Sequence, residues 1–226
     1  KEVKTKIGDL VEVPFGSKKE LGVIWKNAYS EPKNIKIKDI IKKTNFSIDI
    51  KLVKFVEWFA AYNMVSIGLV LKMVIGNADK FIKKKEELIK NKKIKSKKYF
   101  LNKEQLSALK FLESVNNKFD VSVLQGTTGS GKTLVYFERI RKIIQEKKQA
   151  LILLPEIFLT NEFKLRFEKF FGIEPAIWHS KITPKQKRII WKGIINNKIQ
   201  IVIGARSSLF LPFKKLGIII VDEEHD

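Results

Sequence analysis

The chain contains no cysteine, and only five of its 45 basic residues are arginine. Without cysteine, the 226 residues cannot form a disulfide-stabilised scaffold or a cysteine-ligated zinc or iron–sulfur site. Histidine is scarce as well, and the spacing of His179 and His225 does not suggest a metal-binding pair. Lysine therefore carries most of the positive charge, a composition that is also typical of proteins from AT-rich genomes.

The formal net charge is +21, which favours a polyanionic partner such as nucleic acid or an anionic membrane. Compositional drift explains the lysine excess equally well, so the charge alone leaves a DNA partner open. The apolar stretch 55–75 approaches the length of a membrane span, but Glu57 and Lys72 interrupt it and Gly68 divides it. We expect two short packed helices there, and no membrane partner.

In the first 76 residues, short stretches in which apolar and polar residues alternate predict strands. A longer region after them predicts helix. Strands are expected at 9–16, 20–25 and 34–41, and helix over 46–75. Aromatic residues recur there at helical spacing and predict a stripe facing the core: Phe55, Trp58, Phe59 and Tyr62. Residues 77–99 are rich in lysine and predict a linker or a solvated helix, with a basic arm that contacts phosphate as the alternative.

From residue 100 onward, apolar strands alternate with amphipathic helices. This pattern predicts an α/β fold with a parallel sheet that is covered on both faces. Asn102 is a plausible N-cap of the first helix. Buried strands are expected at 121–126, 150–155, 199–205 and 216–222, with a shorter one at 175–179. Ligands of such sheets bind at the carboxyl ends of the strands.

The segment GTTGSGKT, residues 126–133, matches the phosphate-loop pattern between a predicted strand and a predicted helix. Glycines allow backbone N–H groups to close around phosphate oxygens, and the helix N-terminus adds its positive dipole. We expect Lys132 to reach the β- and γ-phosphates and Thr133 to ligate Mg²⁺. The expected nucleotide-binding residues are Gly126, Thr127, Thr128, Gly129, Ser130, Gly131, Lys132 and Thr133.

The chain closes with IIIVDEEHD, in which four apolar residues predict a buried strand before a cluster of acids. Asp222 would emerge at the carboxyl end of that strand and hold Mg²⁺ opposite the phosphate loop. Glu223 would then be placed to orient and deprotonate an attacking water. A solvated acidic turn is the alternative. Catalytic roles are thus expected for Glu223, Lys132 and Asp222.

The sequence Asp-Glu-Glu-His after an apolar strand resembles the second motif of superfamily-2 helicases. Further segments, above all IVIGARSSLFLPFKKLGIIIVDEEHD (201–226), together with LLPEIFLT and VPFGSKKELGVIW, resemble the PriA family of bacterial replication-restart helicases. The resemblance covers nearly the whole chain in order. It implies a 3′-end DNA-binding domain at 1–76, the lysine-rich linker at 77–99 in place of a winged helix, and a RecA-like ATP-binding lobe at 100–226.

The resemblance also implies a function and further site residues. Members of the family are ATP- and Mg²⁺-dependent 3′–5′ DNA helicases of the bacterial cytoplasm and nucleoid, which act at forked DNA with primosome proteins and single-strand-binding protein. Gln105 is placed by the motif to read adenine. Five residues fall where the family binds DNA: Gly16, Lys38, Thr160, Arg206 and Ser207. Arg206 also follows a strand in a Gly/Ser-rich loop, where free N–H groups suit phosphate. A structural salt bridge is the alternative for Arg206.

The sequence departs from the family pattern in several places. The opening strand with its acidic residue and most of the winged helix are missing, and LTNE stands where LTPQ is usual. No residue is given after Asp226, so by this resemblance we expect the chain to lack the second lobe and the cysteine-rich domain to which zinc would bind. For this chain alone we expect weak nucleotide binding and turnover near zero. The alternative is a non-catalytic DNA-binding fragment of a helicase gene that is split or decaying. Another P-loop ATPase, such as a transporter subunit, is disfavoured because DEEHD and GARSSLF fit it poorly.

Overall fold

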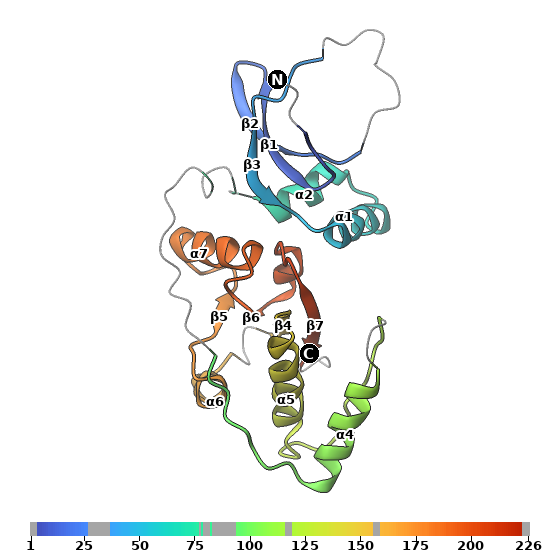
Figure 1. Cartoon of the computed structure of the whole chain (residues 1–226), viewed down its shortest axis with the longest axis vertical. Helices are drawn as coiled ribbons and strands as arrows, with labels where there is room; N and C mark the ends of the chain where they lie inside the picture. Colours follow the sequence, from blue (N-terminus) through green and yellow to red (C-terminus); the bar gives the residue numbers. More distant parts are fainter. Residues whose placement is uncertain are drawn as a thin grey trace. The chain divides into compact units, whose positions relative to one another are not determined.

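The computed structural model describes residues 4–26, 37–76, 78, 82, 94–115, 119–155 and 159–222. These residues group into two compact units (Figure 1). The first is drawn from residues 1–89, 182–198 and 209–214, and the second from residues 90–181, 199–208 and 215–226. The predicted domain boundaries at residues 76 and 99 stay predictions, and most of the lysine-rich stretch between them lies outside the described residues.

The first unit contains a three-stranded antiparallel sheet of order β2-β1-β3. Strands β1 (Asp9–Phe15) and β2 (Lys18–Val23) form a hairpin, which confirms the first two predicted strands. The prediction of a third strand over 34–41 is wrong for its described part, 37–41, which contains no strand. Strand β3 instead covers Lys42–Ser47, because its register is fixed by pairing with β1 rather than by the apolar residues before it.

Two helices follow the sheet, α1 (Ile50–Tyr62) and α2 (Ile67–Ile75). The Asp49 carboxylate accepts a hydrogen bond from the Lys51 backbone N–H and caps α1, a common way to satisfy a free donor at a helix start. The prediction of two short helices in place of one long apolar span is thus confirmed. Among the described residues, no helix is both long enough and apolar enough to cross a membrane.

The predicted aromatic core stripe of α1 is only partly correct. The buried face of this helix is instead aliphatic, formed by Leu52, Val53, Val56 and Ala60. Phe55 and Phe59 pack on Phe210 with ring centroids 5.5 and 5.0 Å apart, whereas Trp58 is 57% exposed and Tyr62 is 74% exposed. Because this helix is apolar around most of its circumference, spacing alone could not select the buried face.

Asp9 is a buried acid at the start of β1. Its carboxylate forms an ion pair with Lys43 of β3 at 2.7 Å and accepts a hydrogen bond from the Lys6 backbone N–H at 2.8 Å. Burial by itself raises the pKa of Asp9, but the Lys43 hydrogen bond and charge and the Lys6 N–H outweigh it, so the pKa is lowered. The carboxylate therefore stabilises the folded unit when it is ionised.

This ion pair predicts a pH dependence of stability. Because the folded pKa of Asp9 lies below its ordinary value of 3.8, its contribution is complete above that value and is lost as the pH falls through the folded pKa. We expect Asp9→Asn to have a lower free energy of urea unfolding than wild type at pH 7, with the difference shrinking in acid. Asp39→Asn, at an exposed position, is the control. A difference that is independent of pH would contradict the assignment.

The second unit contains a four-stranded parallel sheet of order β5-β6-β4-β7. Its strands are β4 (Gln149–Leu153), β5 (Ala176–Trp178), β6 (Ile201–Gly204) and β7 (Leu216–Val221). This confirms the predicted parallel α/β sheet. The helices expected after residue 100 are also present: α4 (Lys103–Ser114), α5 (Lys132–Gln145) and α6 (Asn161–Phe171) in this unit, and α7 (Pro184–Ile195), which groups with the first unit. The 3₁₀ helix η2 (Arg206–Phe210) follows β6.

Helices α5 and α6 form the main core of the second unit with one face of the sheet. Phe137 of α5 lies at its centre, 1% exposed, with its ring 5.1–6.0 Å from four phenylalanine rings of α6. Ile152 and Ile203 face this cluster from the sheet. The alternate residues Leu151 and Val202 are fully buried as well, so the centre of the sheet is covered on both faces, as predicted.

Two strand predictions fail at the edge of the second unit. Residues 121–126 contain no strand, and Val121 and Val123 are 75% and 88% exposed, because no described strand pairs with this segment. Strand β7 exists but is not fully buried, since Ile219 and Val221 are 43% and 58% exposed. It forms an edge of the described sheet and is packed on one face only.

The aromatic cluster predicts a large dependence of stability on one side chain. Phe137→Ala should lower the free energy of unfolding by about 3–5 kcal/mol, because it removes a buried ring and leaves a cavity. Phe111→Ala, at a 62% exposed position of α4, should change it by less than about 0.5 kcal/mol. Urea unfolding followed by circular dichroism measures both. Equal effects of the two variants would contradict the central role of Phe137.

Candidate nucleotide-binding site

The phosphate-loop motif folds as a compact turn that leads into α5. Gly129 and Gly131 adopt φ angles of +81° and +86°, which residues with a side chain rarely reach. The Ser130 backbone N–H donates to the Thr127 carbonyl oxygen at 3.2 Å and closes the turn. The sequence pattern therefore places glycine where the backbone needs a left-handed conformation.

The start of α5 offers backbone donors to an anion. Its N-cap is Gly131, and no side chain caps this helix. The first N–H groups of an α-helix have no partner within the helix, and the helix dipole adds a partial positive charge there. This end of α5 thus suits a phosphate group.

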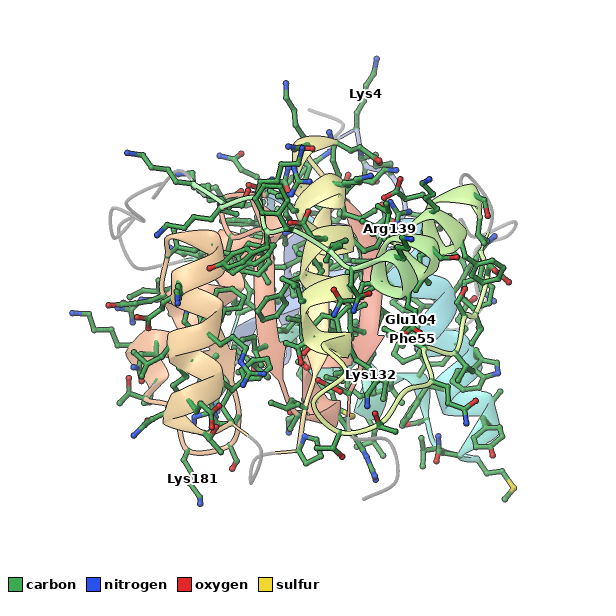
Figure 2. All side chains as sticks on the ribbon, turned by 90° about the horizontal axis from the view of Figure 1, so that it is seen from below. Lys4, Phe55, Glu104, Lys132, Arg139 and Lys181 are labelled. Atoms are coloured by element: carbon green, nitrogen blue, oxygen red, sulfur yellow. The ribbon has the colours of Figure 1, made fainter. Side chains whose placement is uncertain are left out.

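Lys132 is the first residue of α5 (Figure 2), and its side chain turns back over the loop. Its Nζ donates hydrogen bonds to the carbonyl oxygens of Gly126 at 2.7 Å and Thr127 at 3.3 Å. Both acceptors are neutral, so an anionic phosphate would attract the ammonium group more strongly. The amine is therefore held at the mouth of the loop.

Gln105, predicted to read adenine, lies beside the loop. Its Oε1 accepts from the Asn102 N–H at 3.0 Å and completes a capping box at the start of α4, which confirms Asn102 as N-cap. Its Nε2 donates to the Ser130 carbonyl oxygen at 2.9 Å. The side chain thus joins α4 to the loop. Its contact with adenine stays a prediction.

Asp222 follows β7 directly, as predicted, and its backbone N–H donates to the Leu153 carbonyl oxygen of β4 at 3.1 Å. Its Oδ2 accepts a hydrogen bond of 2.7 Å from the hydroxyl group of Tyr136, one turn into α5. Thr133 is three residues before Tyr136 on the same face of α5, and its side chain lowers the pKa of Tyr136 against the larger effects that raise it. Thr133 and Asp222, 89 residues apart in sequence, therefore both lie near the hydroxyl group of Tyr136.

Sequence reasoning missed Tyr136. Its ring is 4% exposed and belongs to the core that also contains Phe137. Burial raises the pKa of Tyr136, and the charge and hydrogen bond of Asp222 raise it further, so the phenol stays a neutral donor. One signal was available: Tyr136 is three residues after Thr133, which places both on the same face of a helix.

The oxygen donors here suit Mg²⁺, which prefers carboxylate, hydroxyl and phosphate oxygens and keeps several waters. Thr133 and Asp222 both lie near the Tyr136 hydroxyl group, and the chemistry of their oxygens fits the expected metal. The described part of the chain contains no cluster of three or more Asp, Glu, His or Cys residues that would form an all-protein metal site. Glu223, the predicted base, lies outside the described residues.

Three predicted DNA-binding residues belong to the second unit. Thr160 is the N-cap of α6, where its hydroxyl accepts from the Phe163 N–H at 3.2 Å. Arg206 and Ser207 are exposed at the start of η2, just after the carboxyl end of β6. Since β4, β6 and β7 are parallel, the segments that follow them begin at the same edge of the sheet as Asp222.

The other two predicted DNA-binding residues belong to the first unit. Gly16 forms the turn between β1 and β2 with φ of +58° and open space around its α-carbon, and Lys38 is exposed before β3. The DNA contacts of all five residues stay predictions.

The parallel sheet, the phosphate loop and the acid at the end of an adjacent strand define the architecture of a P-loop lobe. The DEAD/DEAH box helicase family model matches residues 102–226, and a 3′ DNA-binding domain model of the PriA type matches residues 1–76. The chain belongs to the DEAD/DEAH box helicase family. The predicted fold class, a RecA-like lobe beside a small β-rich domain, is thereby confirmed.

Similar proteins cover almost the whole chain. It is 42% identical to Replication restart protein PriA of Rickettsia felis over 97% of this chain and 34% of that protein. It is 36% identical to the protein of the same name from Helicobacter pylori over 97% of this chain and 33% of that protein. The match to the Bacillus subtilis protein, 41% identical, covers 49% of this chain and 14% of the relative.

The predicted resemblance to PriA is confirmed by these matches, and the chain corresponds to the amino-terminal part of its relatives. It spans about a third of the length of the relatives from Rickettsia felis and Helicobacter pylori.

Substitution of the two loop glycines with positive φ, Gly129 and Gly131, should lower the free energy of unfolding by different amounts. An alanine at either position should lower the free energy of unfolding by about 1–2 kcal/mol, because both need positive φ. A β-carbon on Gly131 would also press against the Gln105 amide, whereas one on Gly129 would meet open space. Gly131→Ala should thus cost about 1 kcal/mol more, the value of one lost hydrogen bond. Urea unfolding compares the two, and equal costs would contradict this packing.

Proposed function

We propose that this chain binds ATP with Mg²⁺ in its P-loop lobe and binds DNA, as the amino-terminal part of a replication-restart helicase of the PriA type. The observation that supports this most directly is the position of Asp222. It lies at the end of a parallel strand and accepts a hydrogen bond from Tyr136, which follows the threonine of the phosphate loop by three residues in α5. This is the arrangement by which P-loop lobes hold a metal ion against nucleotide phosphates.

Each residue has a distinct task in this proposal. The loop backbone and the start of α5 bind phosphate oxygens, and Lys132 exchanges its two carbonyl partners for them. Thr133 and Asp222 would hold Mg²⁺, which supplies charge neutralisation at the phosphates when it is bound. Glu223 would orient the attacking water in the complete enzyme. Gln105 would recognise the adenine base from its place beside the loop.

DNA is the proposed second ligand. Its contacts would include Gly16 and Lys38 in the small sheet domain and Thr160, Arg206 and Ser207 in the lobe. In the described part of the chain, Arg206 is exposed and no hydrogen bond or ion pair is assigned to it, which suits a contact with the DNA backbone. Primosome proteins and single-strand-binding protein are the proposed partners of the complete protein. It would act in the bacterial cytoplasm, at forked DNA near the nucleoid.

Lys132→Ala tests nucleotide binding. We expect the variant to bind ADP about ten- to a hundredfold more weakly than wild type by isothermal titration, because a charge-assisted hydrogen bond to phosphate is lost. Lys169→Ala, which removes an exposed lysine from α6 of the same unit, should bind ADP like wild type. If wild type and Lys132→Ala bind equally poorly while DNA binding stays strongly salt-dependent, the non-catalytic DNA-binding alternative is favoured instead.

A further inference from the structure

Tyr136 is buried in the core by its ring and reaches the candidate site with its hydroxyl group alone. The ring belongs to the cluster that includes Ile152 and Leu154, and it meets Phe137 edge to face at 5.2 Å. Packing of this kind leaves a side chain little freedom to turn. The phenol oxygen is therefore a fixed point between α5 and the end of β7.

The hydrogen bond at this oxygen has a fixed direction. A carboxylate can only accept, so the Tyr136 hydroxyl donates its proton to Asp222 Oδ2 across the 2.7 Å contact. The hydroxyl group therefore holds one oxygen of the carboxylate in place.

This hydrogen bond determines how the candidate metal ligand Asp222 presents its two oxygens. Asp222, with Oδ2 engaged by Tyr136, keeps its other oxygen available. Groups behind metal ligands commonly orient them in this way, and their loss costs 10–100-fold in metal affinity in other proteins.

Asp222 has a particular need for such support. It follows an edge strand whose residues Ile219 and Val221 are partly exposed, so β7 packs on one face only. The hydrogen bond from its N–H to Leu153 fixes the main chain but leaves the side chain free to rotate. Among the residues that the structure describes, Tyr136 is the side chain seen to hold the carboxylate.

We propose that Tyr136 is a positioning residue of the nucleotide–Mg²⁺ site, whose hydroxyl group holds Oδ2 of Asp222 so that the other carboxylate oxygen is presented to the ion. The inference rests on the proposed ATP and Mg²⁺ binding. It assigns Tyr136 a role in metal affinity, separate from the affinity of the loop for phosphate.

The test compares Tyr136→Phe with wild type by titration calorimetry with ADP, in EDTA and in Mg²⁺. Phenylalanine keeps the ring and its packing but removes the hydroxyl group. In EDTA the two proteins should bind ADP within about twofold of each other, and the gain in affinity on adding Mg²⁺ should be about tenfold smaller in the variant. Tyr99→Phe is the matched control: its ring stacks on Phe170 at 5.3 Å in the same unit, and the substitution likewise removes only a hydroxyl group. It should retain the full Mg²⁺ gain.

A double-mutant cycle shows whether Tyr136 acts through Asp222. In an Asp222→Ala background, Tyr136→Phe should produce no further loss of the Mg²⁺ gain, whereas independent effects would add. Near-UV circular dichroism verifies that each variant keeps its packed core.

Three outcomes would overturn the proposal. The first is an unchanged Mg²⁺ gain in Tyr136→Phe. The second is a Tyr136→Phe variant that loses ADP affinity equally in EDTA and in Mg²⁺, or that lacks the near-UV signal of a packed core. Either result would mean that the hydroxyl group has a structural role only. The third is wild type that binds no ADP in either condition, which refutes the proposed function and this inference with it. ADP binding by wild type together with an unaltered variant refutes the inference alone.

Discussion

The parallel pairing of β4 with β7 is the constraint on which the site depends. It places Val221 beside Leu153 and so brings Asp222 to the carboxyl edge of the sheet, where the Leu153 carbonyl accepts its N–H. A shift of one residue would turn each side chain of β7 to the opposite face and move the carboxylate away from α5. Helix α5 packs along the same two strands, so one register aligns the acid that we propose as a metal ligand with the phosphate loop (Figure 1).

The elements that could be predicted are those whose sequence signal is local. The glycines of the phosphate loop, the Asn102 capping box and the apolar runs of β4 and β6 are determined by their own residues, and the structure has them where they were expected. The first residues of α5 and the acid after β7 follow from the same motifs. Most of the candidate site was therefore visible in the sequence.

The predictions that failed depend on partners. Residues 121–126 have strand propensity, but a strand needs a neighbour to bond with, and no described strand pairs with them. Strand β3 begins at Lys42 because β1 sets the register, although Ile37 and Ile41 before it are more apolar and stay exposed. Helix α1 has an aromatic face and an aliphatic face, and the aliphatic face is the one that is buried. Tyr136 was missed for a related reason. Its hydroxyl group bonds to a carboxylate 86 residues away, and no local sequence pattern indicates that contact.

The hydrogen bond between Tyr136 and Asp222 also connects the apolar core of the lobe to the candidate nucleotide-binding site. Phe137, the next residue, fills the centre of the aromatic cluster, so the same turn of α5 that is held by packing carries the phenol. A displacement of α5 relative to β7 would break the 2.7 Å hydrogen bond and leave a buried phenol without its acceptor, which is unfavourable. The separation of helix and strand, and with it the separation of Thr133 from Asp222, is thus fixed by a polar contact inside an apolar core. Such a contact specifies one geometry where apolar packing alone would tolerate several.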